Sequence, residues 1–145
     1  MRSFALAVVA LLALHGCAPP PKVAEAPPPP PPPPSPTPPT QNAPMCARPP
    51  EKAAFDVSAL KSHLMVTAVT CHTEERYNDF IRQFQPYLAT NEKTLSGFFQ
   101  RAYGRRAQSS QDDYVTSLAN AQSQLGVKAG TLFCSYNLGM FDEVM

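Results

Sequence analysis

From about residue 54 onward, apolar side chains recur every three or four positions, a spacing that places them on one face of an α-helix. The first stripe predicts a helix over residues 56–71, with Asp56 or Ser58 as its N-cap. Its inward positions are Val57, Leu60, Leu64, Ala68 and Cys71. No part of the sequence shows the alternation of apolar and polar residues that a half-buried β-strand requires. The pattern therefore predicts an all-α fold.

Two further stripes follow this helix. Glu74 and Glu75 begin the second, where the helix dipole favours negative charge, and Pro86 should end or kink it. Asn91 can cap a third helix, which closes at Gly104 because glycine readily adopts the left-handed conformation found at helix ends. The apolar positions of these two stripes are Tyr77, Phe80, Ile81 and Phe84, then Leu95, Phe98, Phe99, Ala102 and Tyr103.

A fourth helix is predicted over residues 110–125, with Asp112 and Asp113 in its first turn and Gly126 as its stop. Residues 131–143 fit a last helix less well, because they contain Gly139. We therefore predict that residues 51–145 form one small all-α domain, a bundle of four or five short helices.

The N-terminus has the features of a secretory signal peptide over residues 1–16. Arg2 supplies positive charge, and residues 4–14 are an uncharged apolar run. That run is too short to cross a bilayer, which needs about 20 helical residues. We therefore expect export through the inner membrane.

A short motif follows the apolar run: Leu14, His15, Gly16 and Cys17. It resembles the lipobox of bacterial lipoproteins, in which the cysteine receives a thioether lipid and becomes the first residue after cleavage. The resemblance implies a membrane anchor on Cys17, with palmitate among its acyl chains. Because Ala18 rather than aspartate follows, it also implies the outer membrane, with the domain in the periplasm or at the cell surface. Ordinary cleavage after Ala18, which would release a soluble secreted protein, is the alternative.

Residues 17–50 are dominated by proline. This segment holds 17 of the chain's 18 prolines, and eight of them are consecutive, from Pro27 to Pro34. Such a run cannot form helical or ladder hydrogen bonds and favours the solvated polyproline II conformation. We expect a disordered, stiff spacer, able to reach roughly 100 Å at about 3.1 Å per residue.

Three cysteines remain besides Cys17, and in an oxidising compartment an odd number permits one intramolecular disulfide. Cys71 lies on the inward stripe of the first predicted helix, and Cys134 lies among apolar and aromatic residues. Cys46 stands between prolines in the spacer. We predict a Cys71–Cys134 disulfide, with Cys46 either free or bonded to a second copy of the chain; three unpaired thiols are the alternative.

Candidate catalytic and metal-binding groups are sparse. The balance of 12 basic and 11 acidic residues argues against nucleic acid as a partner. Cys71 and His72 are adjacent, so on a helix they point about 100° apart and do not form a nucleophile–base pair. With His63 they would still lack a fourth zinc ligand, and we expect His63 to face solvent. We predict no metal and no cofactor.

Two carboxylate pairs, Glu74–Glu75 and Asp112–Asp113, could serve a cell-wall hydrolase, but helix capping explains each pair. We therefore predict a non-enzymatic, lipid-anchored envelope protein with an interaction or structural role. Its partner would be another envelope protein or a cell-wall polymer. A cell-wall hydrolase and a soluble secreted binding protein are the alternatives. The aromatic content leaves open whether some rings form an exposed contact patch.

Overall fold

The computed structural model describes residues 43–145, so the predicted signal peptide, Cys17 and the proline run from Pro27 to Pro34 lie outside the described residues. Residues 43–145 contain helices and no strand, which confirms the all-α prediction. The helices are α1 (Pro49–Cys71), α2 (Glu74–Tyr103), the 3-10 helix η1 (Gly104–Arg106), α3 (Ala107–Ala129), α4 (Leu132–Asn137) and α5 (Met140–Val144). Three of them are long, where the sequence predicted only short ones.

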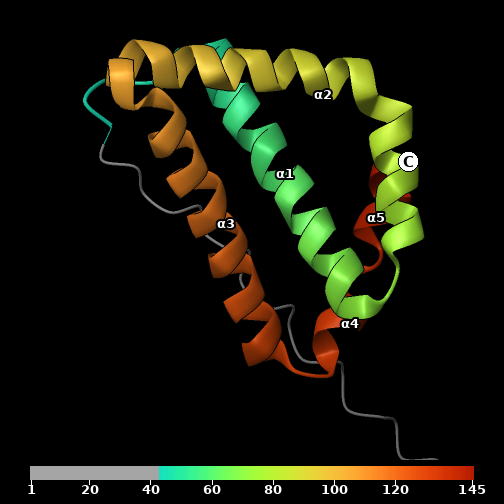
Figure 1. Cartoon of the computed structure of the whole chain (residues 1–145). Coiled ribbons are helices and arrows are strands. Elements are labelled where there is room, and N and C mark those ends of the chain that lie inside the picture. Colours follow the sequence, from blue (N-terminus) through green and yellow to red (C-terminus); the bar gives the residue numbers. More distant parts are fainter. Residues whose placement is uncertain (1–42) are drawn as a thin grey trace, which may run out of the picture. The chain divides into compact units, whose positions relative to one another are not determined.

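Helix α1 lies between α3 and the first half of α2, and the second half of α2 crosses one end of both (Figure 1). Helix α1 begins at Pro49, so the N-caps predicted at Asp56 and Ser58 are wrong. Prolines suit the first positions of a helix because the amides there need no intrahelical partner. The Glu51 side chain accepts a hydrogen bond from the Arg48 amide at 2.7 Å, which closes the first turn.

An ion pair fixes this first turn of α1 to the distant end of α2. Glu51 is buried and pairs with Arg101, whose guanidinium also lies over the Phe98 ring, 5.6 Å from its centroid. The hydrogen bond from Arg101 and the backbone amide of Arg48 hold the pKa of Glu51 below its ordinary value of 4.5. The carboxylate is therefore ionised at neutral pH and ties the end of the proline-rich region to the domain.

Helix α2 continues through Pro86, where two separate helices were expected. Proline lacks an amide hydrogen and its ring crowds the carbonyl four residues earlier, so it bends a helix that packing holds together. Figure 1 shows α2 strongly bent between its two halves. Asn91 lies inside α2 and donates its side-chain amide to the Tyr87 carbonyl at 2.9 Å, so its predicted capping role is wrong.

Glycines end both long helices that follow α1. Gly104 ends α2, as predicted, and Gly130 ends α3, each with a φ of 55°. Gly126 was predicted to end α3 and instead lies inside it, buried. A Cβ atom there would sit 3.6 Å from the Phe133 ring, an ordinary van der Waals contact, so the helix packs closely on this ring without requiring a glycine.

Helix α3 also begins at Ala107, earlier than expected. Asp112 and Asp113 therefore lie beyond its first turn, which contains no acidic residue. The capping role predicted for this pair is wrong, whereas Glu74 and Glu75 do lie in the first turn of α2.

The core has two apolar clusters. The aromatic junction, where the second half of α2 crosses α1 and α3, contains Ala54, Leu95, Phe98, Phe99, Ala107, Tyr114 and Leu118. Its rings meet edge to face: Phe55 lies 5.0 Å from Phe98 and 5.1 Å from Tyr114, measured between centroids. A smaller cluster joins α1, the first half of α2 and α5 through Leu64, Ala68, Phe80 and Phe141. Much of the aromatic content is therefore core.

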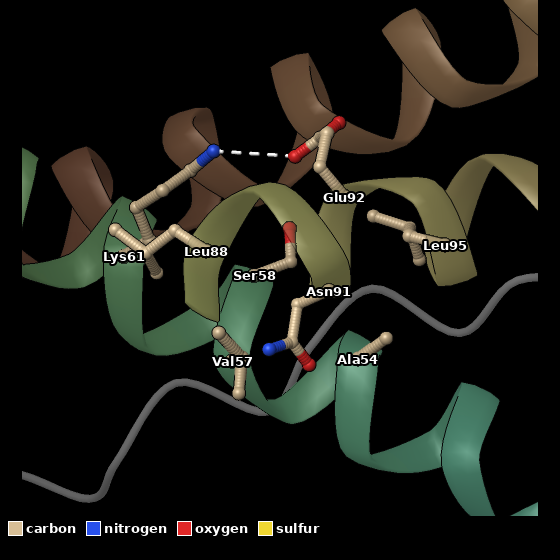
Figure 2. Close-up of a pocket in the computed structure, with 8 residues that line it drawn as sticks. All are labelled: Ala54, Val57, Ser58, Lys61, Leu88, Asn91, Glu92 and Leu95. Atoms are coloured by element: carbon tan, nitrogen blue, oxygen red, sulfur yellow. Dashed lines mark hydrogen bonds and ion pairs between the residues drawn. The ribbon is translucent and has the colours of Figure 1, made fainter. Parts of the chain in front are cut away.

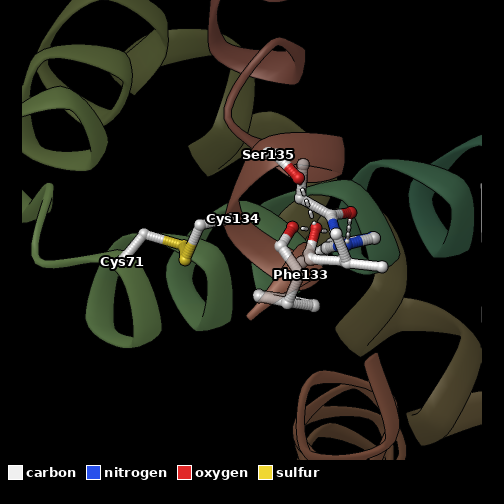
Figure 3. The surroundings of a disulfide bond; sticks show 7 residues. Cys71, Phe133, Cys134 and Ser135 are labelled. Atoms are coloured by element: carbon white, nitrogen blue, oxygen red, sulfur yellow. Dashed lines mark hydrogen bonds between the residues drawn. A yellow bond between two sulfur atoms is a disulfide. The ribbon is translucent and has the colours of Figure 1, made fainter. Parts of the chain in front are cut away.

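The C-terminal segment is fastened to α1 and α2 by three kinds of contact. A disulfide joins Cys71 to Cys134, with the two Cα atoms 5.7 Å apart (Figure 3). Arg76 pairs with Asp142, and its guanidinium lies over the Phe141 ring, 5.0 Å from the centroid.

The third contact is a hydrogen bond between His63 and Asn137. The Asn137 amide nitrogen donates to the Phe133 carbonyl at 2.8 Å, so its oxygen faces His63 Nε2, 2.9 Å away, and accepts. His63 is half-buried rather than solvent-facing as predicted. Burial lowers its pKa from the ordinary value of 6.5, and the bond to Asn137 opposes that effect. Neutral His63 of α1 therefore packs against the C-terminal segment.

Candidate binding cleft

An open cleft of about 820 Å³ lies between the three long helices. Helix α1 contributes Ser58, Lys61, Ser62 and Met65. Because α1 runs between the first half of α2 and α3, it forms the base of the cleft and the other two helices form its sides (Figure 1). The volume is in the range of pockets that hold ligands in proteins, roughly 300 to 1,000 Å³.

Each side of the cleft is one face of a helix. Helix α3 contributes Gln108, Gln111, Asp112, Val115 and Thr116, which recur at i, i+3, i+4, i+7 and i+8 along one face. Helix α2 contributes Tyr77, Ile81, Gln85, Leu88, Ala89 and Glu92. Both faces mix apolar side chains with amides and carboxylates. The cleft therefore offers apolar contact and hydrogen bonds together.

Two large apolar side chains of the cleft are accessible to solvent. Met65 is 38% exposed and Val115 is 42% exposed, one at the base and one on the α3 side. Ile81 and Leu88 on the α2 side are half-buried. A concave surface that exposes large apolar residues loses that exposure when a partner covers it, which is favourable by about 25 cal/mol per Å² of apolar area.

A polar network joins the three helices that line the cleft. Lys61 Nζ lies 3.3 Å from Glu92 Oε2, and Gln111 donates to Glu92 Oε1 at 2.8 Å. Figure 2 shows this ion pair between α1 and α2. On α3, Gln108 donates to Asp112 at 2.9 Å. Two carboxylates and one ammonium line the cleft, so its surface carries an excess negative charge.

A second, much smaller hollow adjoins the cleft. It has about 10 Å³ of accessible space, which is room for about one water molecule, and it shares Ser58, Lys61, Leu88 and Glu92 with the cleft (Figure 2). Burial raises the pKa of the neighbouring core residue Tyr114 to about 12; Asp56 adds to the increase, and a hydrogen bond with Ser58 opposes it. Tyr114 thus stays protonated and holds Ser58 at the base of the cleft.

Apart from Asp112, the residues predicted from the sequence as candidate sites do not line the cleft. Cys71 is bonded to Cys134 and so has no thiol for catalysis or metal binding, while Cys46 is free and exposed. No group of three or more potential metal ligands gathers within residues 43–145. In the same part of the chain, no helix is long and apolar enough to cross a membrane.

Sequence reasoning missed Asp112 as a cleft residue because it assigned this side chain to helix capping. The available signal was the second face of α3, where Gln108, Gln111, Asp112 and Val115 recur at helical spacing beside the apolar core stripe. Comparison with known protein families, curated proteins and solved structures gives no match, so the chemistry of the cleft itself must support any functional assignment.

Proposed function

We propose that this protein is a lipid-anchored component of the bacterial envelope whose helical domain binds another envelope component through the cleft between α1, α2 and α3. The anchor follows from the lipobox-like sequence that ends at Cys17, and the outer membrane follows from Ala18. The proline-rich segment would carry the domain away from the membrane surface.

The observation that carries the interaction role is the chemistry of the cleft. Exposed Met65 and Val115 lie at its base and side, while Lys61, Glu92 and Asp112 supply charge among them. Protein interfaces have this composition, with apolar side chains that lose water at the centre and polar groups at the rim.

A hydrolase is the second candidate, because Glu92 and Asp112 both line the cleft. Glu92 is already engaged by Lys61 and Gln111, which favours a structural role for this carboxylate. We expect that purified protein carrying Glu92→Gln or Asp112→Asn releases the same amount of soluble material from cell-wall sacculi as the unaltered protein does. Release that the unaltered protein catalyses and Asp112→Asn abolishes would favour the hydrolase.

The anchor is tested by mass spectrometry of the mature N-terminus together with cell fractionation. We expect acyl chains on Cys17 and a membrane-bound protein, and we expect Cys17→Ser to move the folded protein to a soluble fraction. Retention of the Cys17→Ser protein in the membrane would contradict the anchor.

The interaction is tested by a photo-crosslinking residue placed in the full chain at Val115 and, as a control, at Val127. Both positions are exposed on α3, at 42% and 84%, but only Val115 lines the cleft. Illumination of intact cells should give a defined adduct with another envelope component from position 115 and none from position 127. No adduct from position 115, or the same adduct from both positions, would refute the role of the cleft.

A further inference from the structure

The three long helices surround a space of the kind that a fourth helix fills in a bundle. Helix α1 lies between α3 and the first half of α2 (Figure 1), and residues of all three helices line the open cleft. The α3 residues that line it run from Gln108 to Thr116, which spans about 12 Å at 1.5 Å per residue. An occupant of two to three helical turns matches this length.

The lining favours an occupant whose backbone hydrogen bonds are already satisfied. Residues 43–145 contain no strand, so they offer no strand edge along which an extended peptide could form a ladder. The cleft lining presents the exposed apolar side chains of Met65 and Val115 and the half-buried side chain of Ile81. A helix satisfies its own backbone and presents apolar side chains at i, i+3, i+4 and i+7 to such a surface.

The charged groups of the cleft determine which charged residues its occupant should carry. Lys61 is neutralised by Glu92, whereas the Asp112 carboxylate is exposed and receives a hydrogen bond from the uncharged Gln108. A lysine or arginine beside the apolar stripe of the occupant would balance Asp112, and an acidic residue there would be repelled.

We infer that the cleft binds an amphipathic helix of a partner protein, with its apolar face against Met65 and Val115 and a basic residue facing Asp112. This inference rests on the proposed function, which requires the cleft to be a contact surface but not this kind of occupant.

The test uses the full mature chain and two stapled helical peptides of about three turns that share the same leucine face. One carries lysines beside the leucines and the other carries glutamates at the same positions. In fluorescence anisotropy titrations, the lysine peptide should bind with a Kd of roughly 10 to 100 µM. The glutamate peptide should bind at least about tenfold more weakly. Asp112→Lys should reverse this preference.

Matched variants locate the binding surface. Val115→Asp should abolish binding of the lysine peptide, while Val127→Asp on the same helix should leave it unchanged. On α1, Met65→Asp should abolish binding, while Val69→Asp, at a position that is 60% exposed and outside the cleft lining, should not. All four positions are solvent-exposed, and circular dichroism checks that each variant keeps its helices.

Several outcomes would overturn the inference. They are no binding of the lysine peptide up to about 1 mM, equal binding of both peptides, or equal loss in the Val127→Asp control. Concentration-dependent dimers that Val115→Asp dissociates would show that a second copy of this chain is the occupant. If cells yield a position-115 adduct whose cross-linked segment is acidic or not helical, the proposed function stands and this inference fails.

Discussion

The same three helices close tightly at one end and stay open along another face. At the aromatic junction, Phe98, Phe99 and Tyr114 are at most 2% exposed, whereas Met65 and Val115 in the cleft are 38% and 42% exposed. The junction side chains are committed to packing, whereas the cleft side chains are available for contact with a partner. Substitutions at the junction should therefore impair folding, and substitutions in the cleft should impair binding.

Phe99→Ala should have the largest effect on the free energy of unfolding. Phe99 is fully buried and its ring lies within 6.0 Å of Phe98, Tyr103 and Tyr114, measured between centroids. Its truncation leaves a cavity among rigid rings, and we expect a loss of about 3 to 5 kcal/mol in the free energy of unfolding, measured by chemical denaturation. Tyr87→Ala, at a 57% exposed position of the same helix, is the control and should cost far less. A similar loss in both variants would contradict the junction's dominant role.

Removal of the disulfide should have the next largest effect, and it should act mainly at the C-terminal end. Cys71 and Cys134 are 63 residues apart, and closing such a loop is worth roughly 4 kcal/mol in the chain-entropy model. Helices α4 and α5 have six and five residues, too few to be stable alone, since isolated helices need about 12 to 15.

Cys134→Ala, or reduction, should therefore lower stability by a few kcal/mol and admit protease to residues 131–145. Limited proteolysis followed by mass spectrometry checks the site of cleavage. Cys46→Ala should change neither quantity, because Cys46 is free and exposed. Protection of the last residues in the reduced protein would mean that Arg76 and the buried Phe141 suffice to hold them.

Acidification should weaken the C-terminal end through His63. Its pKa is lowered in the folded protein, so the unfolded chain takes up the proton first. The stabilisation is complete above pH 6.5 and is lost as the pH falls from 6.5 through the lower folded-state pKa. His63→Gln keeps a donor for Asn137 without a titrating ring, and its unfolding free energy should vary less between pH 7 and pH 5. An unchanged pH dependence would show that His63 does not cause the loss of stability at low pH.

Substitution in the cleft should have the smallest effect on folding. Val115→Asp places a charge at an exposed position and should change the unfolding free energy by no more than about 0.5 kcal/mol, as measured by chemical denaturation. A loss comparable to that of Phe99→Ala would mean that the cleft belongs to the core, and the contrast between the two regions would fail.

The sequence predicted the elements that depend on local pattern. Gly104 as the end of α2 and the acidic first turn of α2 at Glu74 follow from helix-end preferences, which act within one turn. The Cys71–Cys134 bond present in the structure is the pair that the apolar patterns favoured.

The missed features depend on contacts between distant parts of the chain. Packing on both sides of Pro86 keeps α2 continuous, and α3 continues through Gly126, which packs against the Phe133 ring. Neighbouring residues in the sequence reveal neither feature. The cleft was missed for the same reason, because its residues come from three helices and no single stripe marks them. The sequence would have had to show that α3 begins at Ala107, because only then does Asp112 lie beyond the first turn and outside a capping role.

The most direct test of the cleft as a contact surface is its accessibility in living cells. Val115→Cys and Val127→Cys would each be placed in full-length protein that carries Cys46→Ala, and maleimide labelling rates would be compared between intact cells and purified protein. Both cysteines should label readily in the purified protein, because both positions are exposed on α3. In cells, we expect labelling to slow severalfold at position 115 and not at position 127. Equal labelling of position 115 in cells and in purified protein would show that nothing covers the cleft and would contradict its role as a contact surface.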